Sequence, residues 1–340
     1  MRAALVEGAF GLGSIRLGSV ETPVPGPEQV LLRVRAASLN YRDLLVAKGE
    51  YNPHYPLPLI LGSDACAEVV AFGPNGEHPG ISLGTRVCPL MVQGWLDGPP
   101  PRSATRSTLG GPLPGVFAEY VVAHKDSLLS VPDYLDDVEA ACLPCAALTA
   151  WSALRALTQV TPGQTVLTLG SGGVSLSALQ IAQISGARVL STSRDAEKRE
   201  RLLALGAEAA LDSNEPGWGR KVRALCADEG VEHVIEVGGA STLVESFSAV
   251  RPGGTISLIG VLSGKAATLN LLPLVMRNVR LQGVFVGHRR SFAELLSAFT
   301  ARAVRPVVDS VYRLPELGHA FERFASGQHF GKVCVRLLDE

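Results

Sequence analysis

The sequence lacks an excess of charge of either sign. Lys and Arg total 31 against 32 Asp and Glu in 340 residues. This balance leaves no strong positive field to attract nucleic acid or an anionic membrane surface. We therefore expect small molecules, or further copies of the chain, as partners.

The sequence also lacks a long uninterrupted apolar run. Residues 156–187 carry no charge, but Pro162, several glycines and polar Gln and Ser residues interrupt them, so they indicate buried strand, loop and helix rather than a membrane span. At the N-terminus, Glu7 comes before an apolar core of signal-peptide length can form. We expect neither a membrane segment nor export.

A pattern of cysteines typical of disulfides or metal sites is missing. The six cysteines are scattered in a chain large enough not to need disulfides. Only Cys142 and Cys145 form a CxxC pair, with neither a nearby histidine nor a second pair. They are interpreted as small buried hydrophobic residues in preference to a redox or metal pair. A reducing, cytoplasmic location is expected.

The apolar pattern changes along the chain, and its length suggests two domains. The first 125 or so residues hold short apolar runs interrupted by Pro and Gly, which indicates an irregular antiparallel β structure. From about Val138, strands alternate with helices, which indicates an α/β fold with a parallel sheet. A closing strand at 332–338 is expected to return to the first domain.

A glycine-rich turn follows a predicted strand and opens a predicted helix at Gly170–Ser175. In this context the first glycine makes the turn, the second lets the backbone approach a pyrophosphate, and the helix N-terminus supplies N–H groups. Ser175 replaces the third glycine and is small enough for close packing. Glycine turns are common, but the α/β context favours phosphate binding. The residues assigned to it are Gly170, Ser171, Gly172, Gly173 and Val174.

The next strand ends without the acidic residue that binds the ribose of NAD. Instead, Ser193, Arg194 and Lys198 offer a hydroxyl and two cations to a 2′-phosphate. Asp195 and Glu197 lie there too, so an ordinary solvated helix start is the alternative. The pattern favours NADP (as NADPH) over NAD.

Several ordered motifs resemble the medium-chain dehydrogenase/reductase superfamily, and within it the zinc-independent, quinone-oxidoreductase-like members. They are ASLNYRDLLVAKGEY (37–51), GSDACAEVVAFG (62–73), FAEYVV (117–122), LPCAALTAW (143–151), the glycine turn, VIEVGG (234–239), GGTISLIG (253–260) and GKVCV (331–335).

The resemblance implies an α/β fold: a Rossmann doubly wound parallel sheet plus a chaperonin-10-like irregular β domain. We expect the β domain at 1–125 and 290–340, and the Rossmann domain at 126–289. Members of the superfamily typically dimerise through their Rossmann sheets. The late strand around 279–286 is a plausible edge for a homodimer.

The resemblance also bears on metal. Zinc-bearing relatives hold a catalytic zinc with Cys, His and Cys, where this chain has Asn40, Ser63 and Cys145. That set is a poor zinc site. The loop at 94–115, which holds four cysteines in those relatives, contains none. No metal is expected.

Four residues are candidates for catalysis. By the resemblance, Asn40 faces nicotinamide and substrate, and its amide N–H groups could stabilise an oxyanion. Tyr41 could donate a proton, although packing beneath the site is slightly favoured. Asp43 orients Asn40 or caps the helix, with direct proton transfer as a minor alternative. Asp64 supports the same group or is a turn residue.

The resemblance adds further cofactor contacts. Thr149 would touch nicotinamide, and a group of later residues would hold its carboxamide. Lys332 would reach the pyrophosphate, with an ordinary exposed lysine as the alternative. The carboxamide residues are Gly238, Ile259, Gly260, Phe285 and Gly287.

These features predict a zinc-independent, NADPH-dependent oxidoreductase that reduces a quinone, an enone or a related small carbonyl compound. Without zinc an alkoxide is hard to form, whereas hydride addition to a conjugated carbonyl gives a delocalised anion that hydrogen bonds can support. A zinc-free alcohol or aldehyde dehydrogenase is the alternative enzyme. A pyridine-nucleotide-binding protein with little turnover also stays open, because function depends on the site rather than the fold.

Overall fold

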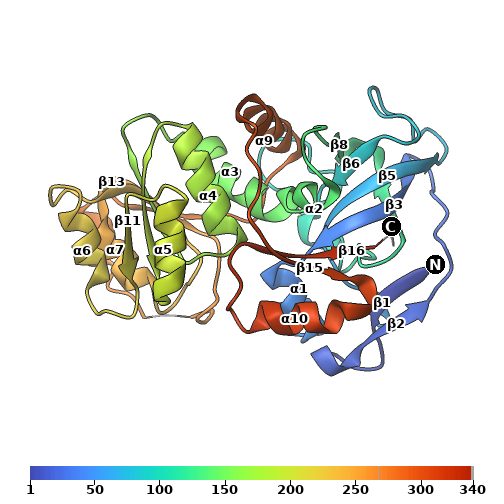
Figure 1. Cartoon of the computed structure of the whole chain (residues 1–340), viewed down its shortest axis with the longest axis horizontal. Helices are drawn as coiled ribbons and strands as arrows, with labels where there is room; N and C mark the ends of the chain where they lie inside the picture. The colour runs from blue at the N-terminus through green and yellow to red at the C-terminus, as the bar shows by residue number, and fades with distance from the viewer. Residues whose placement is uncertain (267, 338–340) are drawn as a thin grey trace. The chain divides into compact units, whose positions relative to one another are not determined.

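The computed structural model describes residues 1–266 and 268–337, and the chain divides into two compact units (Figure 1). The first unit comprises Met1–Leu148 and Gly287–Glu340, and the second comprises Thr149–Val286. The C-terminal segment therefore returns to the first unit, as the sequence predicts. The first unit extends beyond the boundary expected at residue 125.

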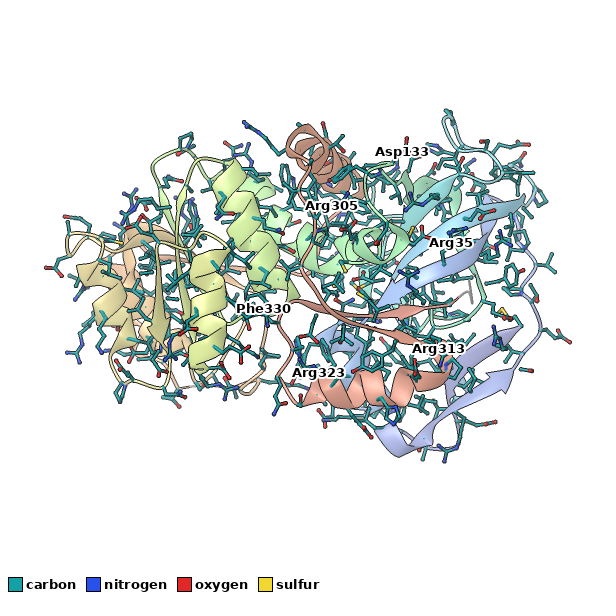
Figure 2. The ribbon with its side chains drawn as sticks, in the orientation of Figure 1. Arg35, Asp133, Arg305, Arg313, Arg323 and Phe330 are labelled. Atoms are coloured by element: carbon teal, nitrogen blue, oxygen red, sulfur yellow. The ribbon has the colours of Figure 1, made fainter. Side chains whose placement is uncertain are left out.

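The extension has a physical cause in the pairing of residues 126–148. Strand β8 (Leu128–Ser130) pairs with β6 (Arg86–Pro89) of the first unit. Helix α2 (Asp137–Ala140) is attached to the same sheet by Arg35, labelled in Figure 2, which donates to Asp137 Oδ2 over 2.6 Å. Sheet pairing thus carries the first unit past the point where the apolar pattern changes.

The first unit is the irregular β domain that the sequence predicts. It holds a three-stranded sheet of order β2-β1-β4 and a seven-stranded sheet of order β15-β16-β3-β5-β6-β8, with β7 also paired to β3. Its elements are β1 (Arg2–Val6), η1 (Leu12–Ser14), β2 (Ile15–Ser19), β3 (Gln29–Ser38), α1 (Tyr41–Ala47), β4 (Leu59–Ile60), β5 (Asp64–Phe72), β6, η2 (Ala104–Arg106), β7 (Tyr120–His124), η3 (Lys125–Ser127), β8, α2, η4 (Leu143–Ala147), α9 (Arg289–Arg302), β15 (Val308–Arg313), η6 (Leu314–Glu316), α10 (Leu317–Ala325) and β16 (Lys332–Arg336).

Residues 94–115 form a loop that lies only partly at the surface. Residues 96–103 are exposed, but Trp95, Thr108 and Leu109 are buried. The far end is held by Arg42, whose guanidinium donates to Thr108 Oγ1 and to the carbonyl oxygens of Leu109 and Gly111.

The second unit is a doubly wound Rossmann domain, as predicted. Its six strands are parallel and have the order β11-β10-β9-β12-β13-β14. The chain runs through α3 (Leu148–Trp151), η5 (Ser152–Ala156), β9 (Thr165–Leu169), α4 (Gly173–Ile184), β10 (Arg188–Ser193), α5 (Ala196–Ala204), β11 (Ala209–Asp212), α6 (Trp218–Ala224), β12 (Val231–Glu236), α7 (Leu243–Ala249), β13 (Val250–Leu258), α8 (Leu272–Met276) and β14 (Arg280–Gly283).

The central strands of this sheet are apolar because helices cover both of their faces. Leu167 of β9, Val234 of β12 and Ile256 of β13 are fully buried, whereas every residue of β14, at the end of the sheet, is exposed. Across the described residues, 1–266 and 268–337, every helix is too short or too polar to cross a bilayer.

Candidate functional site

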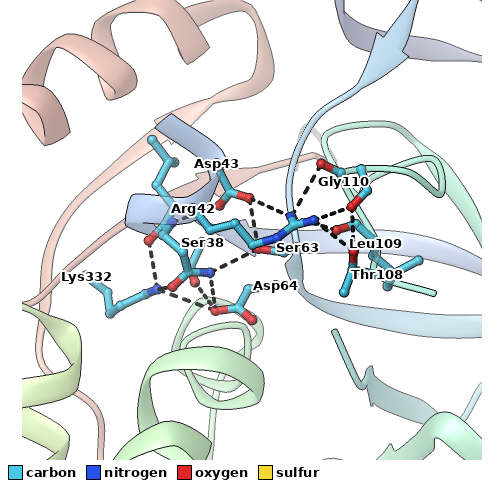
Figure 3. A network of polar contacts seen from close by, with 12 residues as sticks. Ser38, Arg42, Asp43, Ser63, Asp64, Thr108, Leu109, Gly110 and Lys332 are labelled. Carbon is cyan, nitrogen blue, oxygen red and sulfur yellow. Dashed lines mark hydrogen bonds and ion pairs between the residues drawn. The ribbon is translucent and has the colours of Figure 1, made fainter. Parts of the chain in front are cut away.

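In the first unit, three strand ends meet beside the start of α1. Strand β3 ends at Ser38, which lies opposite Asp64, the first residue of β5, and opposite Cys334 near the start of β16. The antiparallel pairing of β5 and β16 with β3 therefore brings Asp64 and Lys332 to the segment that leads into Asn40. Figure 3 shows the polar network that results.

Asp43 closes the first turn of α1. Its Oδ2 accepts the backbone N–H of Asn40 over 2.8 Å, and its Oδ1 accepts the Ser63 hydroxyl over 2.8 Å. The predicted capping role is thus what the structure shows. Asp43 is fully buried, and burial raises the pKa of its carboxyl from 3.8 to about 6 despite the nearby charge of Arg42 and both hydrogen bonds.

The Asn40 amide is fully engaged. Its Nδ2 donates to Asp64 Oδ2 over 2.9 Å and to Ser63 Oγ over 3.3 Å, while its Oδ1 accepts from Lys332 Nζ over 2.6 Å. The side chain is 8% exposed. Of the two donated bonds, the longer one to Ser63 is the weaker, so it is the one that a substrate oxygen could replace.

Lys332 lies in this network, and the alternative of an ordinary exposed lysine is wrong because it is 4% exposed. Besides Asn40, its ammonium donates to the carbonyl of Leu39 over 2.8 Å and contacts Asp64 Oδ2 at 3.4 Å. Burial lowers the pKa of Lys332, but the nearby carboxylate of Asp64 raises it, and the pKa lies above its ordinary value. The ammonium therefore stays charged.

Tyr41 and Arg42 follow Asn40 in the sequence but face different surroundings. Tyr41 is partly buried and packs against the apolar core of the first unit, so its catalytic role stays a prediction. Arg42 was not predicted, and no sequence signal marks it, because the residues that accept its hydrogen bonds lie more than sixty positions away. It anchors the turn at Thr108–Gly111 under the site.

In the second unit, the glycine turn has the shape that a phosphate site needs. Gly170 has φ +73°, which favours glycine, and an added Cβ at Gly170 or Gly172 would meet open space. Gly172 precedes α4, whose first N–H groups thus lie beside that space. Ser175 is buried and donates to the carbonyl of Leu169 over 2.6 Å, which joins helix to strand where a third glycine would stand. The turn fits a pyrophosphate.

The end of β10 carries hydroxyl and cationic groups. Ser193 Oγ accepts the backbone N–H of Asp195, and Arg194 is exposed. Asp195 caps α5 by accepting the N–H of Lys198 over 3.0 Å. Ser193, Arg194 and Lys198 therefore lie within one turn of the strand end, where a 2′-phosphate could be held.

The loops after β12 and β13 meet at the same sheet edge as the glycine turn, because the strands are parallel. An added Cβ at Gly238 would lie 2.3 Å from Thr242 Oγ1, and one at Gly260 would lie 2.1 Å from the carbonyl of Val237. Backbone thus leaves room only for glycine at Gly260, whereas a larger residue at Gly238 would have to displace the Thr242 side chain. Ile259 donates its N–H to the carbonyl of Glu236 over 2.9 Å.

Glu236 is a positioning residue that sequence reasoning missed. Its buried carboxylate accepts the N–H groups of Gly238 and Gly239 and the hydroxyls of Thr242 and Ser246. The signal was present, because an acidic residue ends the apolar strand VIE, and only Val237 separates it from two glycines.

The remaining cofactor candidates are scattered over both units. Thr149 is buried in α3, Phe285 is 38% exposed after β14, and Gly287 is buried at the start of the first unit's second segment. Their contacts with nicotinamide stay predictions.

The residues at the zinc positions do not fit a zinc ion. Asn40 Oδ1 already accepts from an ammonium, and the Ser63 hydroxyl donates to Asp43. Of the three, only Cys145 has a side chain of the kind that zinc normally takes as a ligand. Within the described part of the chain, no three His, Cys, Asp or Glu side chains lie close enough together to bind a metal.

Comparisons with known proteins agree with this architecture. Residues 26–133 match the alcohol dehydrogenase GroES-like domain family, and residues 173–301 match the zinc-binding dehydrogenase family. A zinc-type alcohol dehydrogenase-like protein of Schizosaccharomyces pombe is 38% identical, with 92% of this chain and 91% of that protein covered. Human quinone oxidoreductase is 27% identical, covering 99% of this chain and 98% of that one.

Two solved structures are similar over the whole chain. An NAD-dependent alcohol dehydrogenase is 30% identical with a TM-score of 0.91, covering 99% of this chain and 100% of that chain. A mycobacterial protein solved with NADPH is 28% identical with a TM-score of 0.85 and the same coverage. The set thus includes relatives described with either pyridine nucleotide.

Proposed function

Because the chain belongs to the medium-chain dehydrogenase/reductase superfamily of NAD(P)-dependent oxidoreductases, we propose that it transfers hydride from NADPH to a quinone, an enone or a related carbonyl compound without zinc. The observation that carries this proposal is the ammonium of Lys332 on the oxygens of Asn40 and Asp64. The ammonium already bound to those oxygens would repel a zinc ion. Without zinc, the first unit has to stabilise the negative charge that develops on the substrate with N–H and O–H donors.

The second unit would hold the nucleotide. The glycine turn and the N-terminus of α4 would bind the pyrophosphate, and Ser193, Arg194 and Lys198 would bind the 2′-phosphate. The strand end has a serine where NAD enzymes have an acid, and this supports NADPH as the preferred form. When bound, the nicotinamide supplies hydride.

The polar cluster would serve the acceptor. Asn40 can exchange its 3.3 Å bond to Ser63 for a substrate oxygen and keep its 2.9 Å bond to Asp64. One N–H then faces the oxygen that becomes negative, while the rest of the amide stays fixed. Ser63 still donates to Asp43, so the exchange leaves no buried hydroxyl without a partner.

One amide donor suits a delocalised anion better than a localised alkoxide. Hydride addition to an enone or quinone spreads charge over several atoms, whereas an alkoxide in the same place would need a stronger counter-charge. The relationship to human quinone oxidoreductase supports this substrate class. Tyr41, the residue after Asn40, is the proposed proton donor beside bulk water.

The test is NADPH oxidation by the purified protein with a benzoquinone, an α,β-unsaturated ketone and an aliphatic aldehyde. The proposal predicts turnover with the quinone or the enone at rates well above the aldehyde. Preference for the aldehyde would favour an alcohol dehydrogenase instead. NADPH binding without turnover of any compound would indicate a nucleotide-binding protein.

We also infer a homodimer through the edge of the Rossmann sheet. Strand β14 is exposed at the end of the sheet order, and the neighbouring α8 exposes Leu272, Val275 and Met276 by more than 60% each. An exposed sheet edge with apolar side chains beside it is normally covered. Sedimentation of the wild type as a dimer and of Val275→Asp as a monomer would support the inference; a monomeric wild type would overturn it. A cytoplasmic location stays a prediction.

A further inference from the structure

Lys332 is built into the first unit as the cation of the Asn40 cluster. All three of its N–H groups are directed at oxygens of that cluster: Asn40 Oδ1 at 2.6 Å, the carbonyl of Leu39 at 2.8 Å and Asp64 Oδ2 at 3.4 Å. An ammonium has only three N–H groups. With all of them used inside the unit, Lys332 has no further donor to offer a pyrophosphate.

The position of the ammonium is fixed by the sheet and not by a flexible side chain alone. Lys332 is the first residue of β16, and the backbone N–H of Leu39 donates to the carbonyl of Val333 over 2.9 Å. Strand pairing thus places Lys332 directly beside the Leu39–Asn40 segment. The side chain is 5% exposed, and a buried charge is retained only where it is paired.

Asp64 depends on this cation. Its Oδ2 accepts from Asn40, Ser38 and Lys332, whereas its Oδ1 is buried and finds no donor among the described residues. The carboxylate is fully buried. Removing the ammonium would leave a buried negative charge held by neutral donors only, which is strongly destabilising.

Asn40 depends on it as well. The two ends of its amide are distinguished by their partners, because the ammonium can only donate to Oδ1 and the carboxylate can only accept from Nδ2. Lys332 and Asp64 together therefore fix the orientation of the Asn40 amide, with Nδ2 facing Ser63. Without Lys332, Oδ1 would lose its donor, and only the two acceptors at Nδ2, Asp64 and Ser63, would oppose rotation of the amide.

We propose that Lys332 is a positioning residue of the catalytic cluster, which fixes the Asn40 amide and neutralises Asp64, and that it is not a ligand of the cofactor pyrophosphate. This inference rests on the proposed function, in which Asn40 donates to the substrate oxygen. Lys332, on the C-terminal strand β16, would thus act on the reaction through Asn40.

The experiment compares Lys332→Met with the double variant Lys332→Met/Asp64→Asn, and uses Lys221→Met, an exposed lysine, as the matched control. Each protein is measured for melting temperature, for NADPH dissociation constant by fluorescence titration, and for kcat with the best quinone or enone. The control is expected to match the wild type in all three.

Lys332→Met should melt about 10 °C below the wild type, because it strands a buried carboxylate in a large domain. The double variant should regain most of that loss, because the stranded charge is removed. Both variants should bind NADPH within about twofold of the wild type, yet lose about 100-fold in kcat at saturating NADPH, the scale of a misplaced catalytic group. A double variant that regains the melting temperature but not kcat would show that Lys332 positions Asn40 and does not act on the rate only by supporting the fold.

Two results would overturn the inference. An NADPH dissociation constant raised tenfold or more in the double variant, with kcat retained at saturating NADPH, would assign Lys332 to the pyrophosphate. A folded double variant with wild-type kcat would show that Asn40 needs no ammonium. If the wild type reduces none of the compounds, the proposed function fails. The melting temperatures still test whether Lys332 stabilises Asp64, and the NADPH dissociation constants still test whether Lys332 binds the pyrophosphate.

Discussion

Asp43 makes the stability of the protein depend on pH in a predictable direction. Its carboxyl is fully buried, and burial raises its pKa from 3.8 to about 6. The folded protein therefore binds this proton more tightly than the unfolded chain does. Stability from this group is fully present below pH 3.8 and is lost as the pH rises through about 6.

The size of the effect follows from the shift. Each pKa unit corresponds to about 1.36 kcal/mol, so a rise from 3.8 to about 6 corresponds to about 3 kcal/mol. Asp43→Asn keeps the shape and an acceptor oxygen for the N–H of Asn40, but it cannot ionise. Between pH 4 and pH 7, the free energy of unfolding of the variant should therefore rise by about 3 kcal/mol relative to that of the wild type.

The assay is denaturant unfolding of wild type and Asp43→Asn at half-unit steps from pH 4 to pH 7.5. The difference in free energy of unfolding between the two proteins is taken at each pH, so that the contributions of all titratable groups present in both proteins cancel. Asp133→Asn, at the exposed position labelled in Figure 2, controls for the loss of one carboxylate. A difference that stays constant across the range would refute the assignment of a raised pKa to Asp43.

Three further substitutions test the site. Asn40→Ala should slow hydride transfer about 100-fold while NADPH affinity changes little, the cost of one lost oxyanion donor, and near-normal rates in single-turnover measurements would make Asn40 a structural residue. The wild type should bind NADPH more tightly than NADH, and Arg194→Ala should narrow that gap by about 1–3 kcal/mol in titrations; equal affinities in the wild type would contradict the assignment. Ser175→Ala loses the hydroxyl bond to Leu169 and should unfold about 1 kcal/mol more easily, so unchanged stability would show that this bond does not fasten α4.

The Rossmann unit could be predicted closely because its signals are local. The alternation of strands and helices, the glycine turn at Gly170 and the cap at Asp195 all depend on residues within a few positions of one another. Even Ser175 in place of a glycine could be interpreted correctly as a packing residue. The periodicity of apolar residues already predicts these strands and helices, so knowing how the strands pair changes the prediction little.

The first unit could be predicted only in outline, because its site is assembled from distant segments. Lys332 and Asn40 are separated by 292 positions, and their contact depends on β16 pairing with β3, which no local pattern specifies. The sequence therefore linked Lys332 to the pyrophosphate by resemblance alone. Asp43 was predicted better, since a capping residue three positions into a helix is a local feature.

Hydride transfer from NADPH without a metal can be tested by removing any bound zinc and measuring the activity that remains. The protein is dialysed against a strong chelator, its zinc content is determined by elemental analysis, and NADPH oxidation with its best quinone or enone is compared before and after. We expect substoichiometric zinc throughout and an unchanged rate of NADPH oxidation. About one tightly held zinc per chain, with activity that falls when it is removed and returns when zinc is added back, would contradict it.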